Sequence, residues 1–183
     1  FTTENTLRVV EYLGKDIPVF RGCSLPMVVS LTEGRREDIP YKGPKDPQDN
    51  VHGDYIDLPP ATIQEQPVSA VRWLVDTLMA SEGDITLIPV GPLTNIAMAL
   101  RIEPRIAQKI KRIVIMGGGC REVNITPTAE FNFWIDPEAA KIVFDCGCDI
   151  LVVPLDATHA AAVSIRTAEA LAAHGGHRLR SRS

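Results

Sequence analysis

Two acids and an amide lie among aromatic residues in the segment AEFNFWIDPEAA, residues 129–140. Burying such a polar group without a partner costs about 1–3 kcal/mol, so each of them is expected to bond the backbone or to face a ligand. Asp136 directly precedes Pro137 and Glu138, which is the pattern of a helix N-cap. We therefore predict that Asp136 stabilises the start of a helix and takes no part in catalysis.

Glu130 and Asn132 come before this predicted helix start. In an extended backbone, residues two apart point to the same side, which would leave Phe131 and Phe133 to pack on the other side. A carboxylate next to an amide can accept hydrogen bonds from sugar hydroxyls and donate to them. The pattern is compatible with a site for a polyol and also with a solvated loop edge, and the residues alone leave both interpretations open.

Three further segments bring useful groups to strand ends or into loops. The glycines of MGGG, residues 116–119, allow a ligand to approach the backbone, although a tight turn alone explains them equally well. In VGPLTN, residues 90–95, a helix start can bind an anion, and the carbonyl groups before it can bind a cation. His52, in HGD, is either a surface residue or an acid or base. The sequence has no dinucleotide fingerprint, phosphate-binding loop, nucleophile elbow or H-E-x-x-H motif.

The elements that must position these groups alternate along the chain. Apolar periodicity predicts helices over 6–14, 67–81, 92–104, 136–147 and 167–176, and strands over 16–22, 84–91, 110–119 and 149–158. This alternation is typical of an α/β fold with a mostly parallel, doubly wound sheet and helices on both faces. Ligands of such sheets bind outside the carboxyl ends of the strands, where segments 90–95, 116–135 and LDATH, residues 155–159, are expected to lie.

Composition restricts the class of protein. The 183 residues are 45% hydrophobic and carry a net charge of −4, which suits one domain and gives no reason to expect a nucleic-acid partner. We expect residues 30–66 to form a long loop and 177–183 a frayed tail. No apolar run is long enough to predict a membrane span. The four cysteines are interpreted as free thiols of a cytoplasmic protein, because the spacing of Cys146 and Cys148 is too tight for a usual zinc site.

Several segments together resemble the inosine-uridine preferring nucleoside hydrolases. They are ITLIPVGPLTNIAMAL, IKRIVIMGGG, Asn124, AEFNFWIDPEAAKIVF and VVPLDATH, and the similarity runs in order from about residue 5 to 176. The resemblance implies an enzyme that cleaves the N-glycosidic bond of ribonucleosides to give base and ribose, with a bound Ca²⁺ that holds ribose hydroxyls and the attacking water. It also implies that the full-length protein forms a homodimer or homotetramer.

The resemblance further implies roles for individual residues. Asn124, Glu130 and Asn132 would hold ribose hydroxyls, and Met116 would line the pocket. Val90 would offer its backbone carbonyl to calcium, and His52 matches a histidine of the pocket loop. Such a clamp would fix the ring and stabilise the oxocarbenium-like transition state of glycosidic cleavage.

Two motifs of the family are absent from the sequence. These are the aspartate cluster D-x-D-x-x-x-D-D, expected before the helix at 6–14, and a His–Asp pair expected beyond Ser183. We therefore expect a single partial domain over residues 1–183, a central fragment that lacks both ends and is inactive alone. Two alternatives stay open: a ribose- or nucleoside-binding module without catalysis, and a non-functional truncation product.

Overall fold

The structure, a computed structural model, describes residues 1–28, 31 and 55–175. Its elements in chain order are α1 (Thr2–Tyr12), α2 (Ala70–Ala80), β1 (Ile85–Leu87), α3 (Thr94–Ile102), the 3₁₀ helix η2 (Pro104–Lys109), β2 (Ile110–Met116), α4 (Phe131–Ile135), α5 (Pro137–Phe144), β3 (Ile150–Val153), α6 (Leu155–Ala160) and α7 (Ile165–Gly175). His52, most of the predicted loop 30–66 and the predicted tail 177–183 lie outside the described residues.

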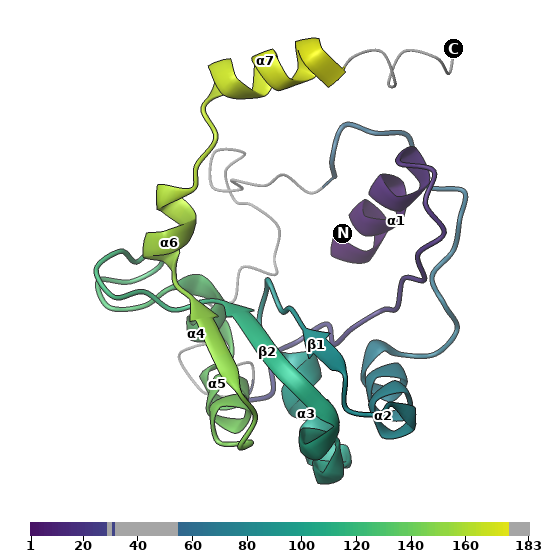
Figure 1. Ribbon diagram of the computed structural model, residues 1–183, viewed down its shortest axis with the longest axis vertical. Coiled ribbons are helices and arrows are strands. Elements are labelled where there is room, and N and C mark those ends of the chain that lie inside the picture. The colour runs from purple at the N-terminus through teal and green to yellow at the C-terminus, as the bar shows by residue number, and fades with distance from the viewer. Residues whose placement is uncertain (29–30, 32–54, 176–183) are drawn as a thin grey trace.

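The described strands form one parallel sheet in the order β1-β2-β3. Helix α3 and η2 connect β1 to β2, and α5 lies between β2 and β3 (Figure 1). Parallel neighbours need such crossover connections, because a tight turn can only reverse the chain. The predicted α/β class and its parallel sheet are confirmed.

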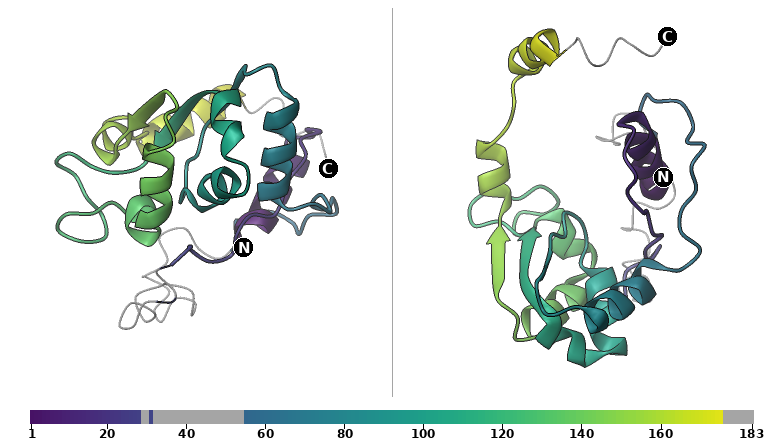
Figure 2. Two further views of the ribbon diagram at one scale, coloured as in Figure 1. Left: turned by 90° about the horizontal axis from the view of Figure 1, so that it is seen from below. Right: turned by 45° about the vertical axis from the view of Figure 1, so that its right-hand side comes forward.

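The main core lies between the sheet and the helices. Ile113 and Ile115 of β2 are fully buried, as are Ala139 and Val143 of α5. Figure 2 shows α2, α3 and α5 together on one face of the sheet. Because side chains alternate along a strand, Val114, which lies between the buried isoleucines, points to the opposite face of the sheet. Its neighbour on that face, Leu151 of β3, is 49% exposed.

Helix α1 packs against a smaller, separate cluster. Leu7 and Val10 pack with Val19 and Ala61. Arg8 reinforces this contact, since it pairs with Glu4 at 2.9 Å and donates to Leu58 O at 3.0 Å. The sequence predicted this helix over 6–14, and the observed helix begins and ends earlier.

Three predicted elements differ from the structure. The predicted strand 16–22 is wrong: Val19 O and Arg21 O each accept one backbone bond, from Gln66 N and Ala70 N, and no ladder forms. The predicted strand 149–158 ends at Val153, and α6 follows it. The segment before Asp136 is a short helix, α4, and not an extended strand. Apolar alternation reports burial of side chains, whereas a strand also needs a backbone partner.

Candidate functional site

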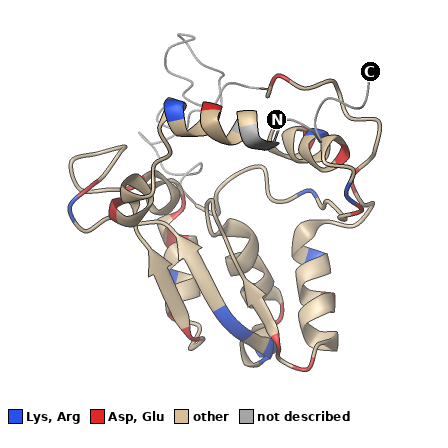
Figure 3. Cartoon of the chain, turned by 45° about the horizontal axis from the view of Figure 1, so that its top comes forward, with Lys and Arg blue, Asp and Glu red and all other residues tan. Residues whose placement is uncertain are grey.

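The carboxyl ends of β1 and β2 lie next to each other and bring the predicted site segments together. Met116 ends β2, and its N–H donates to Pro89 O at 2.9 Å. Val90 follows Pro89 and is 74% exposed. The opposite end of the sheet carries Arg112, paired with Asp149 at 2.6 Å, and Figure 3 shows the basic residues of β2 at that end. The charges of β2 are therefore kept away from the strand ends where ligands of parallel sheets bind.

The glycines that follow β2 are required by packing. An added Cβ at Gly117 would lie 2.3 Å from the Phe133 ring, and one at Gly118 would lie 2.9 Å from it. Gly118 also has a φ of +68°, which residues with a side chain rarely adopt. At Gly119 an added Cβ would lie 1.9 Å from Glu122 O. Of the two interpretations of MGGG, a tight, closely packed turn accounts for all three glycines.

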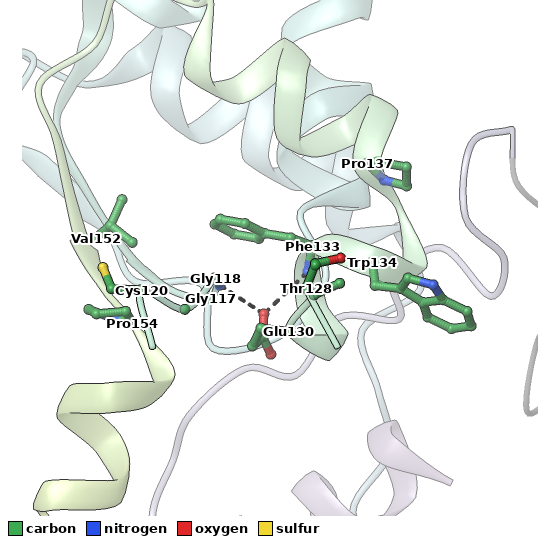
Figure 4. A pocket seen from close by; sticks show the side chains of 12 residues that line it. Gly117, Gly118, Cys120, Thr128, Glu130, Phe133, Trp134, Pro137, Val152 and Pro154 are labelled. Carbon is green, nitrogen blue, oxygen red and sulfur yellow. Dashed lines mark hydrogen bonds between the residues drawn. The ribbon is translucent and has the colours of Figure 1, made fainter. Parts of the chain in front are cut away.

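Glu130 is a buried carboxylate that links this turn to α4. It is the N-cap of α4 and only 3% exposed. Its Oε1 accepts from Asn132 N at 2.9 Å, and its Oε2 accepts from Gly118 N at 2.8 Å and from Phe133 N at 3.3 Å. Figure 4 shows the side chain between the helix start and the turn of residues 117–122 after β2, here called the glycine turn. An ionised carboxylate has about four acceptor positions, so these backbone donors leave capacity for a further hydroxyl.

Asn132 and Asn124 join the same network. The Asn132 side chain is 8% exposed and donates from Nδ2 to Met116 O and Sδ, both at 3.2 Å. Asn124 is exposed, and its Oδ1 accepts from Phe131 N at 2.9 Å. Within the part of the chain that the structure describes, Asn124 Nδ2 has no hydrogen-bond acceptor. The structure thus connects Met116, Asn124, Glu130 and Asn132 through α4, although the prediction placed Glu130 and Asn132 on one side of an extended segment.

Asp136 is confirmed as a helix cap. It is fully buried, and its Oδ1 accepts from Ala139 N at 3.1 Å at the start of α5. Its Oδ2 accepts from the Thr94 hydroxyl at 2.5 Å and from Met27 N at 3.0 Å. These last two partners are distant in sequence, so no local pattern could reveal them. Asp136 therefore joins α5 to α3 and to the segment after residue 22.

Two hollows lie beside the strand ends, and of the predicted site residues that the structure describes, Glu130 and Val90 line them while Met116, Asn124 and Asn132 do not. One of about 640 Å³ is lined by Glu130, Trp134, Thr128 and the glycine turn (Figure 4). The other, of about 760 Å³, is lined by Val90, residues 17–26 and the amino-terminal end of α1. Glu130 and Val90 thus line different hollows.

Asp156 holds the far side of the glycine turn, a role that the sequence analysis missed. Its Oδ2 accepts from Cys120 N at 2.8 Å and its Oδ1 from Arg121 N at 2.9 Å. These backbone donors lower the pKa of the Asp156 carboxyl because they stabilise its ionised form, and the N–H of Cys120 has the largest effect. The feature of the sequence that could have drawn attention to Asp156 is Pro154 in VVPLDATH, because proline favours the end of a strand and the start of a helix.

The described residues contain no group of three or more His, Cys, Asp or Glu side chains that could hold a metal ion. Calcium takes about six to eight oxygen ligands, so a single backbone carbonyl such as that of Val90 does not form a site by itself. In the described part of the chain, no helix is both long and apolar enough to cross a membrane.

Comparison with known proteins decides the family. The sequence model described as "Inosine-uridine preferring nucleoside hydrolase" matches residues 1–181. The chain belongs to this nucleoside hydrolase family. A pyrimidine-specific ribonucleoside hydrolase, RihB, of Escherichia coli O157:H7 is 44% identical over 162 residues, which are 86% of this chain and 47% of the relative. RihB of Shigella flexneri is 43% identical over the same shares.

Solved nucleoside hydrolases share the fold. A purine-preferring ribonucleoside hydrolase from Gardnerella vaginalis superposes with a TM-score of 0.71 at 28% identity, covering 84% of this chain and 48% of that one. A plant nucleoside hydrolase superposes with a TM-score of 0.62 at 32% identity, covering 86% of this chain and 48% of that one. The chain spans about half the length of the nucleoside hydrolases that it matches.

Proposed function

We propose that this chain supplies the ribose-holding part of a nucleoside N-ribohydrolase, which cleaves the N-glycosidic bond of ribonucleosides to base and ribose. The observation that carries the proposal is the buried Glu130 carboxylate, tied to Asn132 and Gly118 at the strand ends of a nucleoside hydrolase fold. The relatives are named as pyrimidine-specific and as purine-preferring. The proposal therefore stops at ribonucleosides and assigns no base.

The chemistry of the network suits a sugar. Backbone donors fix the Glu130 carboxylate, so its remaining acceptor positions already point in one direction. A sugar could therefore bind without further ordering of this side chain. The Asn124 amide can donate to a ribose hydroxyl while its oxygen holds Phe131 N. Asn132 and Met116 are bonded to each other and would form the floor beside the sugar. Hydroxyls bound in this way would hold the ring as positive charge develops on it during cleavage, and the anionic Glu130 would favour that charge.

Calcium is the cofactor that we propose for the whole protein, on the strength of the family. Val90 is the one residue of this chain proposed as its ligand, through the backbone carbonyl. The described residues contain no group of three or more His, Cys, Asp or Glu side chains that could hold a metal ion, so they do not by themselves fit a calcium site, and no step of the reaction is assigned to the metal here. His52, proposed as an acid or base of the pocket, lies outside the described residues.

We also propose a cytoplasmic location and a homo-oligomeric full-length protein. The four cysteines are free, which is typical of a reducing compartment and supports the first point. The family resemblance supports the second.

Thermal melting of the 183-residue chain with and without millimolar ribose or inosine, in the presence of Ca²⁺, tests the ribose site. A ligand that binds only the folded state raises the melting temperature, so we expect a rise with either ligand. Glu130→Gln keeps the shape of the side chain but removes its negative charge, and it should reduce the ligand-dependent rise in melting temperature. Asp145→Asn is the matched control, because Asp145 forms an exposed pair with Lys141. A ligand-independent melting temperature in a cooperatively folded chain would contradict the proposal.

The same preparation separates ribose binding without turnover from catalysis by the isolated chain and from a non-functional product. We propose that the chain binds ribose but does not release base, and a sensitive assay of base release from inosine and uridine checks this. Turnover at a rate typical of enzymes, about 1 s⁻¹ or more, would show that the chain is active alone. Aggregation without any effect of ligand on melting would favour a non-functional product.

A further inference from the structure

The glycine turn, residues 117–122, is held by carboxylates on both sides. On one side Glu130 accepts from Gly118 N at 2.8 Å. On the other side Asp156 accepts from Cys120 N at 2.8 Å and from Arg121 N at 2.9 Å. Hydrogen bonds to an ionised acceptor are about twice as strong as neutral ones, so these contacts are the strongest polar restraints on the turn.

The two restraints are coupled through a short, stiff stretch of backbone. Leu155, next to Asp156, donates its N–H to Gly118 O at 2.9 Å, while the N–H of the same glycine meets Glu130. Between the two restraints lies Gly119, where an added Cβ would lie 1.9 Å from Glu122 O. A turn this tight has few ways to adjust, so a displacement at residues 120 and 121 must reach Gly118.

Another contact on the turn is weaker. His159 of α6 pairs with Glu122, and both side chains are about half exposed. Exposed ion pairs contribute little to stability because water and salt screen them. The Asp156 contacts are made to the backbone itself, so they and not the His159 pair determine the path of the turn.

We propose that Asp156 is a positioning residue for the ribose-binding carboxylate: it fixes the glycine turn so that Gly118 N–H orients Glu130. The ribose part of this inference rests on the proposed function, whereas the coupling from Asp156 to Glu130 does not. Asp156 bonds the backbone of the turn at residues 120 and 121 and not Glu130 itself, so its effect on that carboxylate must pass through the turn.

Amide hydrogen exchange measured by NMR on the ¹⁵N-labelled chain tests the coupling without any ligand. In Asp156→Asn we expect exchange at Cys120 and Arg121 to accelerate roughly tenfold, because each loses a charge-assisted bond. The decisive signal is Gly118, which Asp156 does not touch and whose exchange should also accelerate. Exchange at Ile113 and Ile115 in the core should stay as in the wild type. Faster exchange at Cys120 and Arg121 with unchanged Gly118 would overturn the proposal.

Two further variants keep the test decisive. Glu122→Gln removes the exposed pair with His159 from the same turn, and it should leave Gly118 exchange unchanged. Asp156→Glu retains the charge but moves it by one carbon, so it replaces Asp156→Asn in the exchange experiment if that variant does not fold. We expect Asp156→Glu to retain part of the protection at Cys120 and Arg121 and to lower it at Gly118. Wild-type exchange at Gly118 in this variant would also overturn the proposal.

A titration of the same samples with D-ribose links the coupling to function. We expect ribose-dependent shifts at Asn132 and Gly118 in the wild type, and an affinity lower by roughly tenfold in Asp156→Asn with an intact core. If the wild type shows no ribose shifts, the proposed ribose site fails, while Gly118 exchange still decides whether Asp156 positions Glu130. If ribose binds Asp156→Asn as well as it binds the wild type, the positioning role is overturned and the ribose site stands.

Discussion

Glu130 Oε2 accepts the backbone N–H of Gly118 at 2.8 Å, and this bond joins the turn after β2 to the N-cap of α4. The same carboxylate accepts from Asn132 N and Phe133 N, so it stabilises the helix start and the turn together. A single side chain therefore builds the local structure that would present it to a sugar. Loss of Glu130 is therefore expected to affect stability as well as the proposed ribose binding, and experiments must separate the two.

We predict that Glu130→Ala lowers the free energy of unfolding by about 1–3 kcal/mol. The change removes an N-cap and leaves the Gly118 and Asn132 N–H groups without their acceptor in a buried place. Glu130→Gln, which keeps one side-chain oxygen, should lower it by less. Urea unfolding of both variants checks this, and Asp145→Asn should stay within about 0.5 kcal/mol of the wild type. Equal stability of Glu130→Ala and wild type would show that the cap is dispensable.

Gly117 is predicted to tolerate no side chain while Phe133 keeps its ring. An added Cβ would lie 2.3 Å from that ring, and overpacking of this kind costs about 1–3 kcal/mol. Gly117→Ala should therefore unfold at lower urea. Gly91→Ala is the matched control, because nothing lies within 4 Å of its added Cβ.

A second change tests the cause. Phe133→Leu removes the ring, so the combined variant Gly117→Ala with Phe133→Leu should lose less stability than the two single changes add up to. Strict additivity would mean that the ring is not what excludes the alanine.

Asp136 and Thr94 should show coupled effects on stability. Asp136→Ala is expected to cost about 3 kcal/mol or more, since it removes acceptors from Thr94, Met27 and Ala139 in a fully buried place. Thr94→Val should cost about 1–2 kcal/mol, because it takes one donor away from the buried carboxylate. In the double variant the Thr94 change should cost almost nothing further, and a thermodynamic cycle measured by urea unfolding checks this.

The thiols should react in an order that follows their burial. Cys148 is half-buried and donates to Ala107 O at 3.3 Å, and burial together with the neighbouring Cys146 raises its pKa to about 12. A thiolate is the reactive form, so Cys148 should resist alkylation at pH 8 while the exposed Cys120 reacts. Mass spectrometry of iodoacetamide-treated protein gives the order. Modification of Cys148 before Cys120 would contradict this assignment.

The sequence by itself determined the features that depend on neighbours along the chain. The alternation of helices and strands from residue 67 onward, the parallel sheet and the capping role of Asp136 all follow from local patterns, because periodicity and caps involve residues within about four positions. The motifs around Met116, Asn124, Glu130 and Asn132 were sufficient to indicate the family. The structure connects these residues in one hydrogen-bonded network, and their contact with ribose stays a prediction.

Only the tertiary structure decided the features that depend on distant partners. Residues 16–22 have the pattern of a strand but find no ladder partner in the described chain, and Glu130 accepts from Gly118 N, 12 positions away, because the turn after β2 and the start of α4 meet there. The bonds from Asp136 to Thr94 and from Asp156 to Cys120 span 42 and 36 positions. A side chain's own neighbours along the chain cannot specify such bonds, because the fold must first bring the two groups into one place and exclude the water that would otherwise bind them.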